Sequence, residues 1–76
     1  IDTQEADNSH FFKGSLTFLT AGAATVGTIF SNGSSNSKIT LQVPGQFIIT
    51  IVGINATQYH VTGFVASATA PDFGDQ

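Results

Sequence analysis

The chain has 76 residues and no cysteine, so it forms one small domain at most and no disulfide stabilises it. Only 9% of the residues are charged, against about a quarter in ordinary soluble domains, and the net charge is −3. Two lysines make no basic patch, which argues against nucleic-acid binding. No apolar run approaches the ~20 residues of a membrane helix, which argues against membrane insertion.

The few charges divide the chain into three parts. Residues 1–9 form a polar acidic N-terminal arm, residues 10–69 a nearly uncharged β domain, and residues 70–76 a short C-terminal tail. The arm holds Asp2, Glu5 and Asp7, and the tail holds Asp72 and Asp75. Between them the only charged side chains are Lys13 and Lys38. Two interpretations of the arm are open: a frayed end, or a segment whose acids contact the lysines of a neighbouring subunit.

The first half of the domain predicts two strands. Residues 10–20 alternate, with Phe12, Leu16 and Phe18 on one face and polar side chains on the other. Residues 24–30 are rich in β-branched side chains and form the second strand. The polar stretch 31–37 contains an Asn-Gly step and is long enough to cross between two sheets.

The second half predicts three more strands. Residues 38–43 alternate cleanly, and Pro44-Gly45 suits a tight turn that would join them to residues 46–52 as a hairpin. Residues 46–52 are apolar on both faces, which is typical of a central strand or one covered on both sides. Residues 58–67 form the last strand. The spacing of strands and turns predicts an all-β single domain, an antiparallel β-sandwich or barrel of about five to six strands.

The chain has seven phenylalanines. Those inside predicted strands are expected in the core: Phe12, Phe18, Phe30, Phe47 and Phe64. Phe11 is out of phase and Phe73 lies in the tail, so these two are candidate contact residues. Exposed apolar side chains on a domain this small mark sites of association.

The residues give no support for catalysis. All carboxylates lie in the arm and tail, so no acid/base pair is held on a strand, and an enzyme is not expected. His10 and His60 are far apart in sequence and are interpreted as surface or interface histidines, so no metal and no cofactor is expected. Two glycosylation sequons are present, at Asn32 and Asn55, both in predicted loops.

A structural subunit is the function that these features favour, with copies of itself or a larger protein lattice as partners. The expected setting is a virion, as a capsid decoration, minor capsid or tail protein. A subunit of a secreted filament assembled by strand addition is the alternative. A carbohydrate- or surface-binding module using Tyr59 and His60 is a further one. Localisation is accordingly expected in a virion or on an extracellular surface, and the start at Ile1 suggests processing from a longer precursor. The residues expected at contacts between subunits are Asp2, Glu5, Asp7, Phe11, Lys13, Lys38, Asp72 and Phe73.

Overall fold

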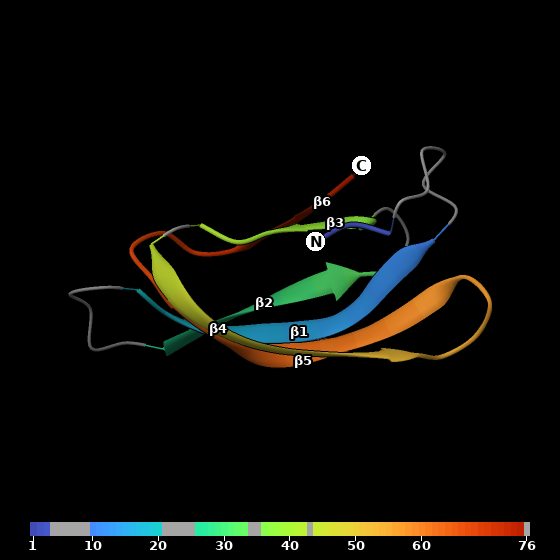
Figure 1. Cartoon of the computed structure of the whole chain (residues 1–76), viewed down its shortest axis with the longest axis horizontal. Helices are drawn as coiled ribbons and strands as arrows, with labels where there is room; N and C mark the ends of the chain where they lie inside the picture. The colour runs from blue at the N-terminus through green and yellow to red at the C-terminus, as the bar shows by residue number, and fades with distance from the viewer. Residues whose placement is uncertain (4–9, 21–25, 34–35, 43, 76) are drawn as a thin grey trace.

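The protein folds into two layers of β-strands, which confirms the predicted all-β class (Figure 1). The computed structural model describes residues 1–3, 10–20, 26–33, 36–42 and 44–75. The strands in these ranges are β1 Phe11–Thr20, β2 Val26–Asn32, β3 Lys38–Thr40, β4 Gly45–Gly53, β5 Gln58–Ser67 and β6 Asp72–Gly74. The small layer lies over the concave side of a curved large sheet, and no closed barrel is formed.

The large sheet has four strands in the order β2-β1-β5-β4. β1 pairs antiparallel with β2 and β4 pairs antiparallel with β5, so each pair is a local two-stranded unit. The two units meet through β1 and β5, which run parallel from Phe11 opposite Gln58 to Thr20 opposite Ser67. The sheet is therefore mixed, and the prediction of a purely antiparallel sandwich is wrong at its centre.

The small sheet is built from both ends of the chain. β3 pairs antiparallel with β6, so the predicted C-terminal tail contains a strand. On the other side of β3, Asp2 forms a β-bridge with Lys38. The amino group of Ile1 donates to the carbonyl of Ile39 at 2.8 Å, and the N–H of Ile39 donates to the carbonyl of Ile1 at 2.6 Å. Residues 1–3 of the predicted arm therefore lie along β3 of their own chain, while residues 4–9 lie outside the described residues.

The core lies between the two layers. Its buried members come from the concave faces of β1 and β5 and from β3: Phe12, Leu16, Val61, Val65 and Ile39. Phe47 and Ile49 of β4 and Phe73 of β6 pack against this cluster. The predicted phase of the first strand is confirmed, because Phe12 and Leu16 are buried while Lys13 is exposed.

Pro44-Gly45 does not make the predicted hairpin. The strands that flank it lie in different layers, because β3 pairs with β6 whereas β4 pairs with β5. Proline has no N–H to give to a strand ladder, and the chain leaves the small sheet here and enters the large one at Gly45. Ile39 and Phe47 can then cover the same core from opposite sides. The stretch 31–37 leads from the large sheet to the small one as expected, but its first two residues, Ser31 and Asn32, belong to β2, so the connection starts later than predicted.

β4 is an edge strand, which corrects the expectation that it is central or covered on both sides. Its concave side chains, Phe47 and Ile49, pack on the core as predicted. Its convex side chains, Ile48 and Val52, are 73% and 56% exposed. The predicted alternation of apolar residues is confirmed, but no described segment of this chain covers Ile48 and Val52 on the convex face.

Two of the phenylalanines expected in the core are on the outside. Phe30 is 74% exposed and Phe64 is 40% exposed, and both belong to the convex face of the large sheet. Phe73, expected as a contact residue of the tail, instead packs against the core through β6. The physical reason is strand phase. Phe30 pairs with Ser15 and Phe64 with Ile48, and all four side chains alternate away from the small sheet.

Candidate functional site

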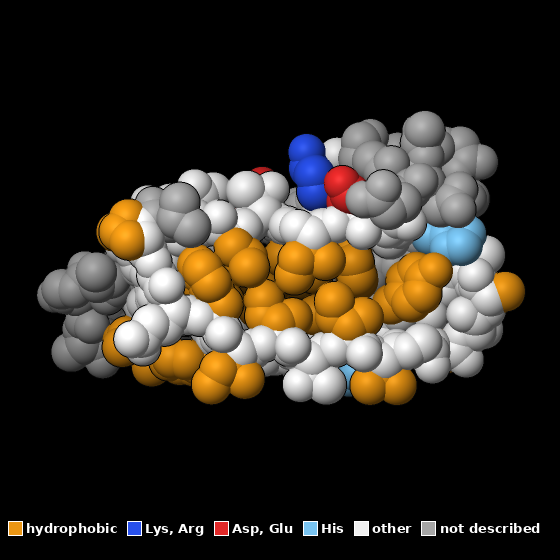
Figure 2. All heavy atoms as spheres, viewed as in Figure 1, with side chains coloured by type: hydrophobic (Ala, Val, Ile, Leu, Met, Phe, Trp, Pro, Cys, Tyr) orange, Lys and Arg blue, Asp and Glu red, His pale blue; other side chains and the backbone are white. Residues whose placement is uncertain are grey.

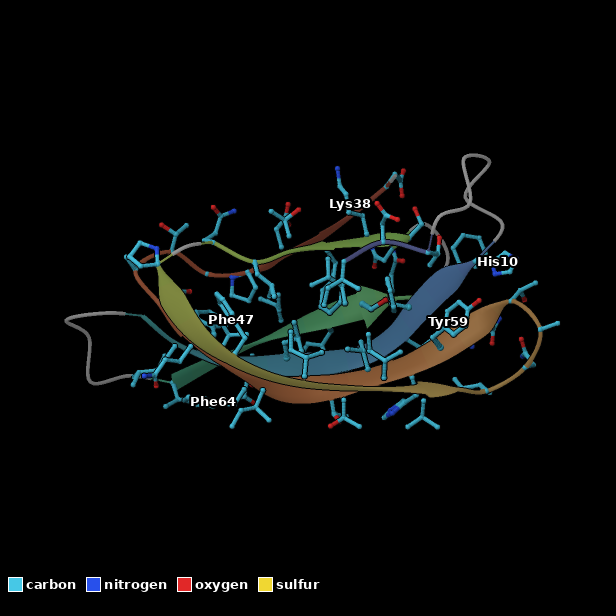
Figure 3. The ribbon with its side chains drawn as sticks, viewed as in Figure 1. His10, Lys38, Phe47, Tyr59 and Phe64 are labelled. Carbon is cyan, nitrogen blue, oxygen red and sulfur yellow. The ribbon has the colours of Figure 1, made fainter. Side chains whose placement is uncertain are left out.

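The convex face of the large sheet is the candidate site, because large hydrophobic side chains are exposed on it. We define it by the outward side chains of its four strands, which the register aligns in rows. Its exposed large hydrophobic residues are Val26, Phe30, Ile48, Val52 and Phe64. Ile48 and Phe64 are direct cross-strand neighbours, so their side chains form one continuous apolar area. Figure 3 shows Phe64 pointing away from the small sheet, whereas Phe47 points toward it.

This convex face is almost free of charge. The four strands of the large sheet contain a single charged residue, Lys13, if histidine is counted as neutral. Lys13 lies in register with His60, and His60 with Val52, at one end of the face. The remaining polar positions include the threonines Thr17, Thr28, Thr50 and Thr62. Lys38, Asp2 and Asp72, by contrast, all belong to the small sheet.

The free edge of β4 borders this face. Within the part of the chain that the structure describes, β4 pairs with β5 on one side only, in an unbroken register from Gly45 opposite Ser67 to Gly53 opposite Tyr59. Edge strands are usually protected by a charge, a proline or a bulge within the strand. β4 has none of the three between Gly45 and Gly53. Its outward N–H and C=O groups are therefore available to another strand.

An open groove lies between β4 and the N-terminal segment. It has a volume of about 210 Å³, and its walls are Ile1, Asp2, Thr3, Phe12, Ile51 and Tyr59. In Figure 2, hydrophobic side chains gather in the middle of this side of the molecule, between the two layers. A second groove, of about 230 Å³, lies between β2 and β6 and includes Phe30, Pro71 and Asp72. Both are smaller than the ~300–1,000 Å³ of typical small-molecule sites.

The histidines are separated by the sheet. His10 Nδ1 is 2.8 Å from the hydroxyl oxygen of Tyr59, and the two rings stack with centroids 5.9 Å apart (Figure 3). His60 alternates to the convex face and is exposed, as predicted. Tyr59 also packs against the core, so Tyr59 and His60 do not form one sugar-binding platform. Among the described residues, no group of three His, Cys, Asp or Glu side chains could hold a metal ion.

The structure places the predicted contact residues in different regions. Lys13 is exposed on the convex face, and Lys38 and Asp72 are exposed on the small sheet. Asp2, Phe11 and Phe73 are half-buried within the fold, and Glu5 and Asp7 lie outside the described residues. The exposed apolar residues of the convex face were not among the predicted contacts. The apolar character of both faces of residues 46–52 was the signal that could have identified Ile48 and Val52.

Asn55 organises the loop between β4 and β5. Its Oδ1 accepts hydrogen bonds from the backbone N–H groups of Thr57 and Gln58, at 2.9 and 3.0 Å. The other sequon asparagine, Asn32, is exposed at the end of β2, where its N–H donates to Asn36 Oδ1 at 2.7 Å. The Asn55 side chain therefore has a structural role whether or not it carries a glycan, whereas at Asn32 the hydrogen bond is made by the backbone.

Asn55→Ala should lower the free energy of unfolding by about 1 kcal/mol, because two loop N–H groups lose their acceptor. Asn55→Asp retains an acceptor oxygen and should remain close to the original stability. Both are measured by urea denaturation. Equal midpoints for Asn55→Ala and the original chain would show that the turn does not depend on this side chain. Intact mass of natively produced protein tests glycosylation separately.

No helix in the described part of the chain is long and apolar enough to span a membrane. Searches of family models, of curated proteins and of solved structures find no protein that this chain matches.

Proposed function

We propose that this protein is a non-enzymatic structural subunit that assembles with copies of itself through the large sheet. The observation that carries the proposal is the convex face, where five large hydrophobic side chains are exposed and the single charged residue, Lys13, lies at one end. Exposed apolar side chains that are cross-strand neighbours, as Ile48 and Phe64 are, are typical of an interface on a small domain. A freely diffusing monomer would keep this surface in contact with water, at a cost that association removes.

The energetics favour association. Burying a large aliphatic or aromatic side chain contributes about 1.5–3 kcal/mol relative to leaving it exposed. Several such residues, including Phe30, Ile48 and Phe64, lie on the convex face. A micromolar complex requires about 8 kcal/mol after the entropic cost of association. Since few charges need to lose water, the desolvation cost of this face is low.

Self-association is tested by sedimentation velocity over a wide concentration range, together with electron microscopy of concentrated protein. We expect species heavier than the 7.9 kDa of a single chain, and little change in their abundance at 1 M NaCl. A monomer at every concentration would refute the proposal. Loss of the assembly in high salt would show that charges, rather than the convex face, hold it together.

The kind of assembly is a separate question for microscopy. A virion component is expected to form closed shells or to decorate one, and a secreted filament subunit to form helical fibres. The exposed edge of β4 favours assemblies in which strands of adjacent subunits pair, and this is compatible with both settings.

A further inference from the structure

The two edges of the large sheet differ in how they can pair with another copy. β4 contains a short run of residues, Phe47 to Gly53, that reads almost the same in both directions about Thr50. Two β-branched aliphatic residues precede Thr50 and two follow it. In antiparallel pairing, a strand meets its own copy reversed. A sequence that is symmetric about its centre therefore presents like side chains to like side chains.

We propose that two copies pair antiparallel through their β4 edges, about a two-fold axis at Thr50, to form one continuous eight-stranded sheet. This inference rests on the proposed function and specifies the contact by which assembly begins. Ile48 then lies opposite the partner's Val52, and Ile49 opposite the partner's Ile51. Phe47 lies opposite the partner's Gly53, where the ring can cover the backbone that glycine leaves open.

This register also joins the convex face of one copy to the convex face of the other. Ile48, Thr50 and Val52 are on the convex face, so each meets a convex-face residue of the partner. The apolar area of Phe64 and Ile48 then continues across the axis onto the partner's Val52. A register centred on Ile49 would instead place Ile48 opposite the partner's Thr50 and Gln46 opposite the partner's Val52. That arrangement loses the apolar pairing of the convex face.

A second copy fits this edge better than an unrelated strand for two reasons. First, β4 from Gly45 to Gly53 has no charge, so no oppositely charged partner is required and no repulsion arises between copies. Second, the other edge strand lacks the symmetry. Reversing β2 about Ile29 would put Phe30 opposite Thr28 and Val26 opposite Asn32. Reversing it about Thr28 would put Val26 opposite Phe30 but Gly27 opposite Ile29. β2 also contacts β6 beside its groove, whereas β4 borders the groove that it shares with the N-terminal segment.

The test compares two lysine substitutions at equivalent exposed threonines. Thr50 and Thr28 both lie on the convex face of an edge strand, one on each edge. Thr50→Lys places two like charges against each other at the axis and should weaken dimerisation at least about 100-fold. Thr28→Lys should change it by less than about threefold. Sedimentation equilibrium gives the dissociation constants, and circular dichroism checks that both variants fold.

Each outcome separates this inference from the proposed function. If the original chain associates and Thr50→Lys associates equally well, the β4 contact is refuted while the proposed function stands. The same holds if Thr28→Lys is the variant that fails to associate, since the contact would then lie on the other part of the convex face. If the original chain is monomeric throughout, the proposed function and this inference are both refuted.

The register is tested by cysteine crosslinking. Because the chain has no cysteine of its own, every disulfide must form between introduced cysteines. Ile48→Cys and Val52→Cys are made singly, one of them isotopically labelled, and mixed under mild oxidation. We expect disulfide-linked dimers that contain one copy of each, at least about fivefold above either variant alone, because opposed residues approach within disulfide range. Random pairing of the two variants would refute the axis at Thr50.

Discussion

Gly14→Ala is expected to lower the free energy of unfolding by about 3 kcal/mol or more, a large part of the stability of a domain this small. Gly14 has φ +123°, a backbone conformation that L-residues with a side chain rarely adopt. A Cβ at this position would also overlap the carbonyl oxygen of Val61 in β5. Val61 is the parallel partner of Gly14 and its side chain is fully buried, so neither strand can move aside without disturbing the core.

The size of this effect is measured by urea denaturation monitored by circular dichroism. Gly74→Ala serves as the control, because a Cβ on Gly74 in β6 would meet no atom within 4 Å. It should change the free energy of unfolding by less than about 0.5 kcal/mol. If Gly14→Ala and Gly74→Ala unfolded at the same urea concentration, β1 and β5 would not approach each other as described.

Leu16→Ala should destabilise the protein by about 2–5 kcal/mol. Leu16 is fully buried at the centre of β1, where it belongs to the cluster with Val61, Val65 and Ile39. Truncation removes three carbons from a core that has few other buried side chains, and the space cannot be filled without moving both layers. The expected result is a clear loss of thermal and urea stability.

Leu19→Ala is the matched control for this substitution. Leu19 lies on the same strand but on the convex face, opposite Val26 and Ala66, and it is only half-buried. It should cost about 1 kcal/mol or less. A one-residue slip of β1 would exchange the two faces. An inverted result, with Leu19→Ala the more damaging variant, would therefore show that β1 has the opposite phase.

The local features of this fold were accessible from sequence because they depend on alternation within one strand. The strand predicted at residues 58–67 is observed as β5, Gln58–Ser67. The phase of Phe12 and Leu16, and the crossing between β2 and β3, were also predicted. Strand order was not. The parallel contact of β1 with β5 joins segments more than half the chain apart. The alternation of apolar and polar residues within a strand does not indicate which other strand pairs with it.

The candidate surface was only partly predictable for a related reason. Apolar residues on both faces of a strand indicate that both faces are to be covered, but not whether the cover comes from the same chain. For Ile48 and Val52 the interpretation assumed the same chain, and the structure leaves them exposed. Phe30 and Phe64 are expected in the core because they lie in predicted strands, and the phase of those strands places them on the convex face instead.

The parallel contact at the centre of the large sheet has a consequence for how the chain folds. The β1–β2 and β4–β5 hairpins are local and can form early, but their docking must close a long loop before any parallel hydrogen bond is gained. Until then, both hairpins keep two open edges and few charges to hold other chains away. Refolding is therefore expected to be slow and to compete with aggregation, so the yield of native protein should fall as the chain concentration rises.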